Sequence, residues 1–151
     1  MTEAIRLLFL SKGLRLLVLH ALILTFQPAV SEPKILVNSN VSLENLDSAY
    51  LNQIFAVQVR KWPSGQAIQI FTLPSSNNLH REFVIERLRI QPHQLDRIWN
   101  RMLFTGTGKP PTVVNSEDDM LKMIQSNSGA IGYVSSDYPA DGVKLLEEVQ
   151  P

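Results

Sequence analysis

The sequence predicts an α/β fold in which a largely parallel or mixed sheet of about five strands is flanked by helices. Three observations support this prediction. Short β-branched and aliphatic runs alternate along the chain with segments whose apolar residues recur at helical spacing. The length of 151 residues fits one domain. No internal repeat or low-complexity segment interrupts the alternation.

The N-terminal part of the chain differs in character from the remainder. Basic residues precede an apolar run at 16–26, and the small residues Ala29 and Ser31 follow at the spacing that signal peptidase accepts. We therefore expect residues 1–31 to be a cleavable secretory signal peptide and residues 32–151 to be a periplasmic domain. The apolar run is shorter than the roughly 20 residues that span a bilayer. A buried core helix and an uncleaved membrane anchor are the alternatives.

The expected domain begins with a buried strand at 34–40, where aliphatic residues are followed by turn formers. Ser42 then offers an N-cap for a helix of about 12 residues. The apolar residues of this expected helix share one face: Leu43, Leu46, Tyr50, Leu51 and Ile54. A turn at 59–66 separates the helix from a second strand at 67–73, in which apolar and polar residues alternate.

Two helices are expected after the second strand. The segment 73–88 begins with a cluster of capping residues and continues as an amphipathic helix, so it reads as a loop that leads into a helix N-terminus. Pro92 begins the next helix, which the glycines of the segment 104–115 end near Phe104.

The C-terminal part is expected to contribute one helix and three short strands. A brief strand at 111–115 is followed by Ser116 and Asp119, which form a capping-box-like helix start. A strand at 129–135 follows that helix, and the segment 144–149 is expected to be an edge strand.

Composition and motifs argue against several function classes. The absence of cysteine excludes disulfides, thiolate metal sites and a cysteine nucleophile. The formal net charge is zero and basic residues are scattered, so no nucleic-acid partner is expected. The histidines are too few for a three-histidine metal site after signal cleavage, and no serine-hydrolase or zinc-protease motif occurs. The acidic residues 117–119 fit a first helical turn, where they complement the helix dipole. We therefore expect no enzymatic activity, no cofactor and no metal.

The segment FTGTGKPP at 104–111 raises the possibility of a phosphate-binding loop. A nucleotide-binding P-loop needs four residues between its first glycine and the Gly-Lys pair, and a helix after it. Here Gly106, Gly108 and Lys109 are too close together, and two prolines force an extended exit. We therefore expect a structural glycine turn, with no part for Lys109 in anion binding.

Four elements together carry a resemblance to a known family: Ile54-Phe55, Trp62-Pro63-Ser64-Gly65, FTGTGKPP and SNSGAIGYV. In their order, from about Lys34 to Val134, the chain resembles short relatives of the phosphate ABC transporter substrate-binding proteins, which are PstS-like members of the periplasmic binding protein type 2 superfamily. The resemblance implies a single lobe of the periplasmic-binding-protein type. It also implies that an oxyanion would contact a loop at a helix N-terminus.

In this sequence that loop precedes the helix that carries Arg81. The candidate ligand-binding residues are Ser75, Ser76, Asn77, Asn78 and Arg81. Free backbone N–H groups at a helix start favour an anion, and hydroxyl and amide groups add donors. Ordinary helix capping explains the same serine and asparagine residues without a ligand. His80 is expected to be exposed or to serve as a cap, and Trp62 and Trp99 to serve in packing.

Two functions are compatible with these observations. The first is an exported, non-enzymatic solute-binding-protein-like domain that binds inorganic phosphate or another small oxyanion weakly and is linked to phosphate transport. The second is an envelope interaction or sensory module that kept the fold, lost the ligand and contacts an inner-membrane transporter or sensor. The absence of the family's Ser-Gly-Thr tripeptide and the single-lobe length favour the second, whereas the serine and asparagine residues at the helix start favour the first.

Overall fold

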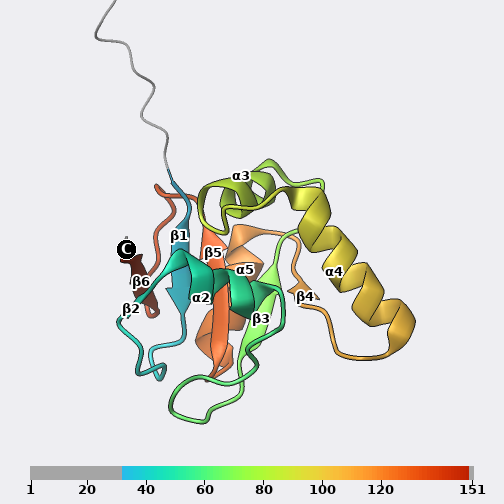
Figure 1. Ribbon diagram of the computed structural model, residues 1–151. Helices are drawn as coiled ribbons and strands as arrows, with labels where there is room; N and C mark the ends of the chain where they lie inside the picture. The colour runs from blue at the N-terminus through green and yellow to red at the C-terminus, as the bar shows by residue number, and fades with distance from the viewer. Residues whose placement is uncertain (1–31, 150–151) are drawn as a thin grey trace, which may run out of the picture. The chain divides into compact units, whose positions relative to one another are not determined.

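Six strands form one mixed sheet in the computed structural model, which describes residues 32–149. The elements follow in chain order (Figure 1): β1 (Lys34–Val37), β2 (Asn45–Leu46), α2 (Ser48–Phe55), β3 (Gln69–Thr72), α3 (Asn78–Glu86), α4 (Pro92–Thr105), β4 (Thr112–Val113), α5 (Glu117–Ser126), β5 (Ala130–Val134) and β6 (Lys144–Glu148). The α/β class and the mixed sheet are confirmed, with one strand more than expected. The expected signal peptide at 1–31 lies outside the described residues.

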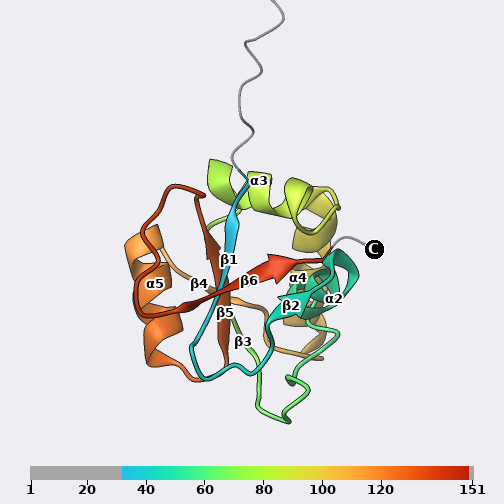
Figure 2. The ribbon, with the colours of Figure 1, turned by 90° about the vertical axis from the view of Figure 1, so that its left-hand side faces the viewer.

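The strand order is β2-β6-β1-β5-β3-β4. The strand β1 is antiparallel to β5 and to β6, whereas β3 is parallel to both β5 and β4. Figure 2 shows helices on both sides of this sheet, with α5 on one face and α2 on the other. Because β3, β4 and β5 run in the same direction, their carboxyl ends meet at one edge of the sheet. The loops that lead into α3 and α5 begin at that edge.

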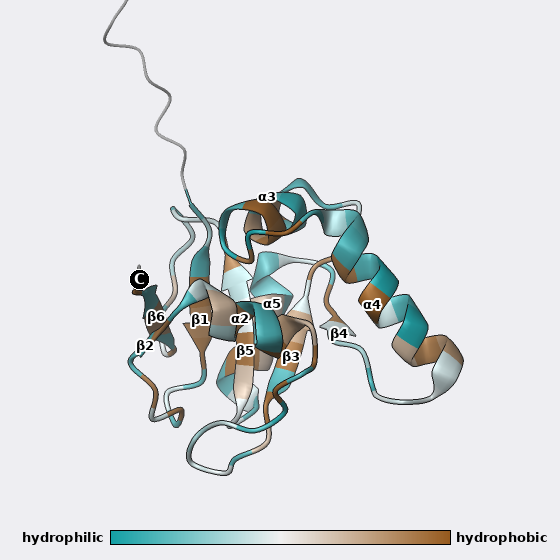
Figure 3. Cartoon of the chain, viewed as in Figure 1, coloured by the Kyte–Doolittle hydropathy of each residue, from teal (hydrophilic) through white to brown (hydrophobic). Residues whose placement is uncertain are grey.

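The core lies between the sheet and these helices. Figure 3 shows hydrophobic residues on the central strands and on parts of the helices. The side chains of Leu51, Ile54 and Phe55 on α2 are fully buried. On the other face, α5 buries Met120 and Ile124 against the sheet. Apolar residues at the spacing i, i+3 and i+4 therefore produce the helix packing that the sequence pattern predicts.

The helix expected from Ser42 begins later than predicted. Its first residue is Ser48, and Asp47 is the N-cap, whose Oδ1 accepts a 2.6 Å hydrogen bond from the backbone N–H of Tyr50. Leu46, which was expected on the helix, belongs to β2 and pairs with β6. This pairing also corrects the expectation that the last strand is an edge strand, because β6 lies between β2 and β1.

The helix ends on either side of the glycine-rich segment lie close to their predicted positions. Pro92 begins α4, which ends at Thr105 rather than Phe104, and Gly106 takes the left-handed conformation with a φ of 64°. This conformation is costly for any residue with a Cβ atom, so the glycine explains the helix end. Ser116 caps α5 and accepts a 3.1 Å hydrogen bond from the backbone N–H of Asp119, as the sequence predicted.

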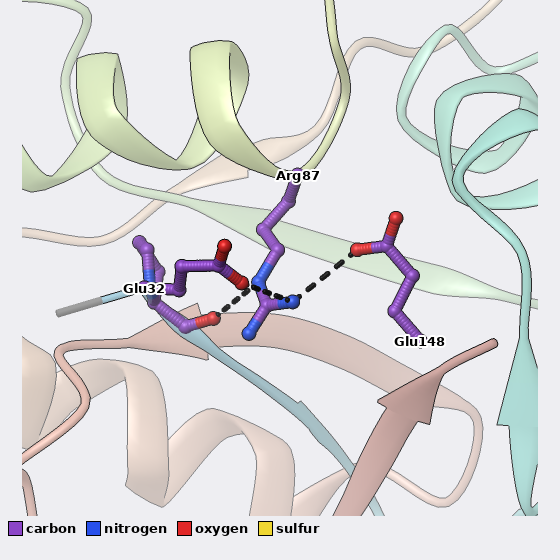
Figure 4. A network of polar contacts seen from close by, with 4 residues as sticks. Glu32, Arg87 and Glu148 are labelled. Atoms are coloured by element: carbon purple, nitrogen blue, oxygen red, sulfur yellow. Dashed lines mark hydrogen bonds and ion pairs between the residues drawn. The ribbon is translucent and has the colours of Figure 1, made fainter. Parts of the chain in front are cut away.

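One ion-pair network connects the beginning and the end of the described chain. Arg87, which follows α3, contacts Glu32 at 2.9 Å and Glu148 of β6 at 3.3 Å, as Figure 4 shows. Its Nε also donates a 2.8 Å hydrogen bond to the carbonyl of Pro33. Most of the Arg87 side chain is shielded from solvent, so these contacts are less weakened by water than a surface pair would be.

Both tryptophans pack in the interior, as expected. The indole N–H of Trp62 donates to the carbonyl of Gly129, and that of Trp99 donates to the carbonyl of Phe55. Residues 32–149 contain no helix long and apolar enough to cross a membrane, and no group of three histidine or acidic side chains that could hold a metal ion.

Candidate functional site

The candidate anion site is the turn that connects β3 to α3. Asn77 is the N-cap of α3 with an extended backbone, and its side-chain oxygen accepts a 2.8 Å hydrogen bond from the N–H of Leu79. The N–H of Asn77 itself donates to the carbonyl of Pro74 at 2.8 Å and closes the turn. The side chain of Asn77 therefore serves as a helix cap, which is the alternative that the sequence left open.

The other predicted site residues differ in how they are engaged. The hydroxyl of Ser75 donates a 2.7 Å hydrogen bond to Asp96 on α4 and so already has a carboxylate partner. Ser76, Asn78 and Arg81 are exposed. Within residues 32–149, their side chains make no hydrogen bond or ion pair. Three of the five predicted side chains are thus open to solvent and to a ligand.

Backbone donors are also open at the start of α3. The N–H of Leu79 is occupied by the cap, and that of Arg81 donates to the carbonyl of Asn77. In the described part of the chain, the N–H groups of Asn78 and His80 have no acceptor. Unpaired N–H groups at the positive end of a helix form the usual site for an anion.

Acidic residues at the same edge of the sheet oppose anion binding. The start of α5 carries Glu117, Asp118 and Asp119, and the carboxylate of Glu117 accepts two hydrogen bonds from Ser135, at 2.6 and 2.7 Å. The hydroxyl of Tyr138 donates to Asp118. The positive end of α5 is therefore already matched by its own carboxylates, and these charges repel an anion nearby.

A buried polar network lies directly below the start of α3. The hydroxyl of Tyr133 on β5 is 2.6 Å from Nδ1 of His80 and 3.0 Å from the hydroxyl of Thr72 on β3. It also accepts a 2.9 Å hydrogen bond from the N–H of Leu73. All these residues are almost fully buried. The network links α3 to two strands and fixes the point where the candidate anion loop leaves the sheet.

His80 is the member of this network whose bonding is incomplete. Its exposed fraction is 1%, which corrects the expectation of an exposed or capping histidine. Burial lowers the pKa of His80 below its usual 6.5, and the negative charge of Asp96 opposes this shift. Its Nε2 is buried without a hydrogen-bond partner in the described residues. The neutral form is therefore favoured, because an imidazolium here would lack solvation.

Sequence reasoning missed this network, although one signal was present. His80, Phe83 and Val84 are spaced i, i+3 and i+4, and all three are buried. The ring of Phe83 stacks on that of Tyr133 with centroids 3.9 Å apart and an angle of 7°. The helical spacing could have placed His80 on the inner face of α3. That His80 meets Tyr133, which is far away in the sequence, was not visible from local pattern.

Comparisons with known proteins agree with this architecture. No family model matches the sequence, and no curated protein matches it. Among solved structures, a phosphate ABC-type transport receptor from Vibrio cholerae is similar with a TM-score of 0.61 and 21% identity, over 80% of this chain and 48% of the other. A putative phosphate substrate-binding protein with bound phosphate from Clostridium perfringens gives a TM-score of 0.62 and 15% identity, over 78% and 45%. PstS from Borrelia burgdorferi gives a TM-score of 0.59 and 12% identity, over 80% of this chain and 49% of the other.

The low identities mean that these similarities establish the fold. The chain spans about half the length of the receptors that it matches. The family resemblance seen in the sequence is thus supported by the arrangement of helices and strands as well as by motifs. The described domain has the fold of the phosphate ABC transporter substrate-binding proteins, over about half of their length.

Proposed function

We propose that this chain is an exported, non-enzymatic solute-binding-protein-like domain that binds phosphate or another small oxyanion weakly at the start of α3. The observation that carries the proposal is the pair of unpaired backbone N–H groups of Asn78 and His80 at the positive end of that helix. The exposed side chains of Ser76 and Arg81 would supply further donors. The structural neighbours named as phosphate receptors support a solute-binding role.

Several features of the same turn make the expected binding weak. Ser75 is already bonded to Asp96, whose charge repels an anion. The family's glycine is replaced by residues with side chains, so the backbone cannot approach a ligand as closely. The described domain also spans only about half of its neighbours. A ligand held by one surface stays partly solvated, and its hydrogen bonds are weaker there.

The proposal includes a location and a partner. The signal-like segment at 1–31 supports export to the periplasm, with cleavage after about residue 31. The receptor-like fold supports an inner-membrane transporter as the partner. The mass of the exported protein tests the first point, because an uncleaved N-terminus would contradict it.

Phosphate titration tests the binding site directly. We expect phosphate to shift the NMR amide signals of residues 75–81 with a dissociation constant on the order of micromolar to millimolar, which corresponds to about 4 to 8 kcal/mol. Arg81→Gln should weaken binding by about 1 kcal/mol or more, because a charged donor is lost. Asp96→Asn should strengthen binding, because a negative charge beside the site is removed. Arg101→Gln, an equivalent change at an exposed position on α4, is the matched control and should have no effect.

A sodium chloride series at equal ionic strength controls for screening. If phosphate shifts the signals of residues 75–81 no more than sodium chloride does, the proposed binding is wrong. If Arg81→Gln and Arg101→Gln behave alike, the attraction is nonspecific and the site is not at α3.

A second function is favoured by a different observation. Leu103 and Phe104 at the end of α4 are 61% and 89% exposed, which is unusual for side chains of this size. We infer that, if no oxyanion binds, this end of α4 is the surface by which an interaction or sensory module contacts an inner-membrane partner. A photo-crosslinking residue at position 104 should then form an adduct with a membrane protein in cells. The same residue at Lys122, exposed on α5, is the control, and equal crosslinking at both positions would contradict this function.

A further inference from the structure

A second concave surface lies beside β3, away from the turn that leads into α3. Its volume is about 350 Å³, and we call it the β3 groove. It is bounded by Val57, Val59 and Arg60, by residues 68–71 at the start of β3, and by the segment 109–112. The connection that follows α4 returns to β4 beside β3, as Figure 1 shows, and its last residues line the groove. A volume of this size is at the lower end of that of small-molecule sites.

The lining of the β3 groove combines apolar and polar residues. Side chains of Ile68, Ile70 and Phe71 contribute to one side, and Pro110 and Pro111 to the other. The prolines have no backbone N–H, so they cannot extend the pairing of β4 with β3 beyond Thr112. The double proline thus keeps the two segments apart next to the first half of β3 and leaves apolar surface accessible.

One cation of the groove is held in place by the backbone. The Nε of Arg60 lies 3.4 Å from the carbonyl of Val57, and its Nη2 lies 3.3 Å from the carbonyl of Thr107. A Cβ atom at Gly108 would come within 3.1 Å of the same Nη2, so the glycine permits this close approach. Guanidinium has five N–H donors, and these two contacts leave three for a ligand.

The second cation is Lys109, which is exposed and has no side-chain partner among residues 32–149. None of the residues that line the groove is acidic. Two positive charges therefore border a partly apolar surface, and no acidic residue lines the groove to neutralise them. A ligand that complements this surface needs a negative group and an apolar body.

We propose that the β3 groove binds a small organic carboxylate that carries an apolar group, with Arg60 and Lys109 contacting the carboxylate and the side chains of β3 and the prolines contacting the apolar group. This site is distinct from the turn at α3 and does not depend on phosphate binding there. It also gives Lys109 a role in binding an anion, which departs from the expectation from the sequence that Lys109 takes no part in anion binding.

Phenylacetate is a suitable probe, and 2-phenylethanol is its uncharged control. We expect phenylacetate to shift the NMR amide signals of residues 57–60, 68–71, Lys109 and Thr112 with a dissociation constant on the order of millimolar, as for a ligand of this size. Lys109→Gln and Arg60→Gln should each weaken it roughly three- to tenfold, because each removes one partly solvated charge contact. Arg81→Gln should leave it unchanged.

The outcomes separate this proposal from the proposed phosphate site. Phenylacetate binding that survives Arg81→Gln, in a protein whose phosphate binding is lost or absent, supports the groove alone. Equal binding of phenylethanol, unchanged affinity in Lys109→Gln, or shifts outside the three segments would each overturn the proposal. Lys109 is exposed, so its variant is expected to fold even if Arg60→Gln disturbs the loop.

Discussion

Removal of one buried hydroxyl group should reveal how much the network beneath α3 stabilises the domain. In Tyr133→Phe the ring remains and can still stack on Phe83, so the core keeps its volume. The change removes the acceptor of the Leu73 N–H and the group that lies 2.6 Å from Nδ1 of His80. The variant therefore isolates hydrogen bonding from packing.

The size of the effect follows from which groups can find new partners. Nδ1 of His80 still has the hydroxyl of Thr72 at 3.1 Å, so this atom can stay bonded. The N–H of Leu73 has no such replacement at a residue that is almost fully buried. A buried donor without a partner costs about 1 to 3 kcal/mol, and the lost bonds to the hydroxyl add about 1 kcal/mol. We expect a loss of about 2 to 4 kcal/mol in the free energy of unfolding.

Urea denaturation measures this loss. With a typical urea slope for a small domain, the midpoint should fall by about 1 to 2 M without a change in slope. Tyr50→Phe is the control, because Tyr50 is half-buried and its hydroxyl has no hydrogen bond in the described residues; its effect should stay within about 0.5 kcal/mol. If Tyr133→Phe is no less stable than Tyr50→Phe, the network does not stabilise the fold and the reasoning is wrong.

Three further predictions concern other buried contacts. Burial lowers the pKa of His80 below its usual 6.5, so the unfolded chain binds more protons than the folded one as the pH falls through 6.5. Stability should therefore be lost as the pH falls below that value, and urea midpoints should show a smaller loss in His80→Asn. A wild-type protein and variant with the same pH dependence would contradict this. Gly129→Ala should be more destabilising than Gly132→Ala in thermal unfolding. The new methyl group would meet the backbone carbonyl of Ala67 in the first variant and the flexible side chain of Met120 in the second. A larger loss of stability in Gly132→Ala would contradict this prediction. Arg87→Ala should lower the free energy of unfolding by about 1 to 3 kcal/mol, because two carboxylates and one carbonyl lose a largely shielded partner. Calorimetry measures this change, and a loss no larger than that of Arg101→Ala would refute the prediction.

Elements whose signals are local were predictable from the sequence. Pro92 and Ser116 mark helix starts through their own backbone and side chain, and Gly106 marks a helix end, so α4 and α5 lie close to where they were expected. The start of α2 was wrong because Leu46 is drawn into a parallel pair with β6, about 100 residues away. No local pattern near Ser42 contains that partner.

The candidate site was predictable to a similar extent. The cap at Asn77 and the exposure of Arg81 follow from a polar cluster before an apolar helical pattern. The bond between Ser75 and Asp96 depends on where α4 crosses the turn, and the meeting of His80 with Tyr133 depends on the packing of α3 over the sheet. Both are tertiary contacts between segments that lie apart in the sequence, and no local pattern in either segment indicates the other.

The strand order determines when the sheet can assemble. The first strand of the domain, β1, has only β5 and β6 as neighbours, and both belong to the segment from Ala130 to Glu148. During synthesis, the apolar residues Ile35 to Val37 therefore remain unpaired until nearly the whole described domain has been made. Contacts across such a separation are slow to form, because a long loop must close before the pairing is gained. The centre of this sheet is completed last, and we expect the domain to fold only after β5 and β6 have been synthesised, in one cooperative step.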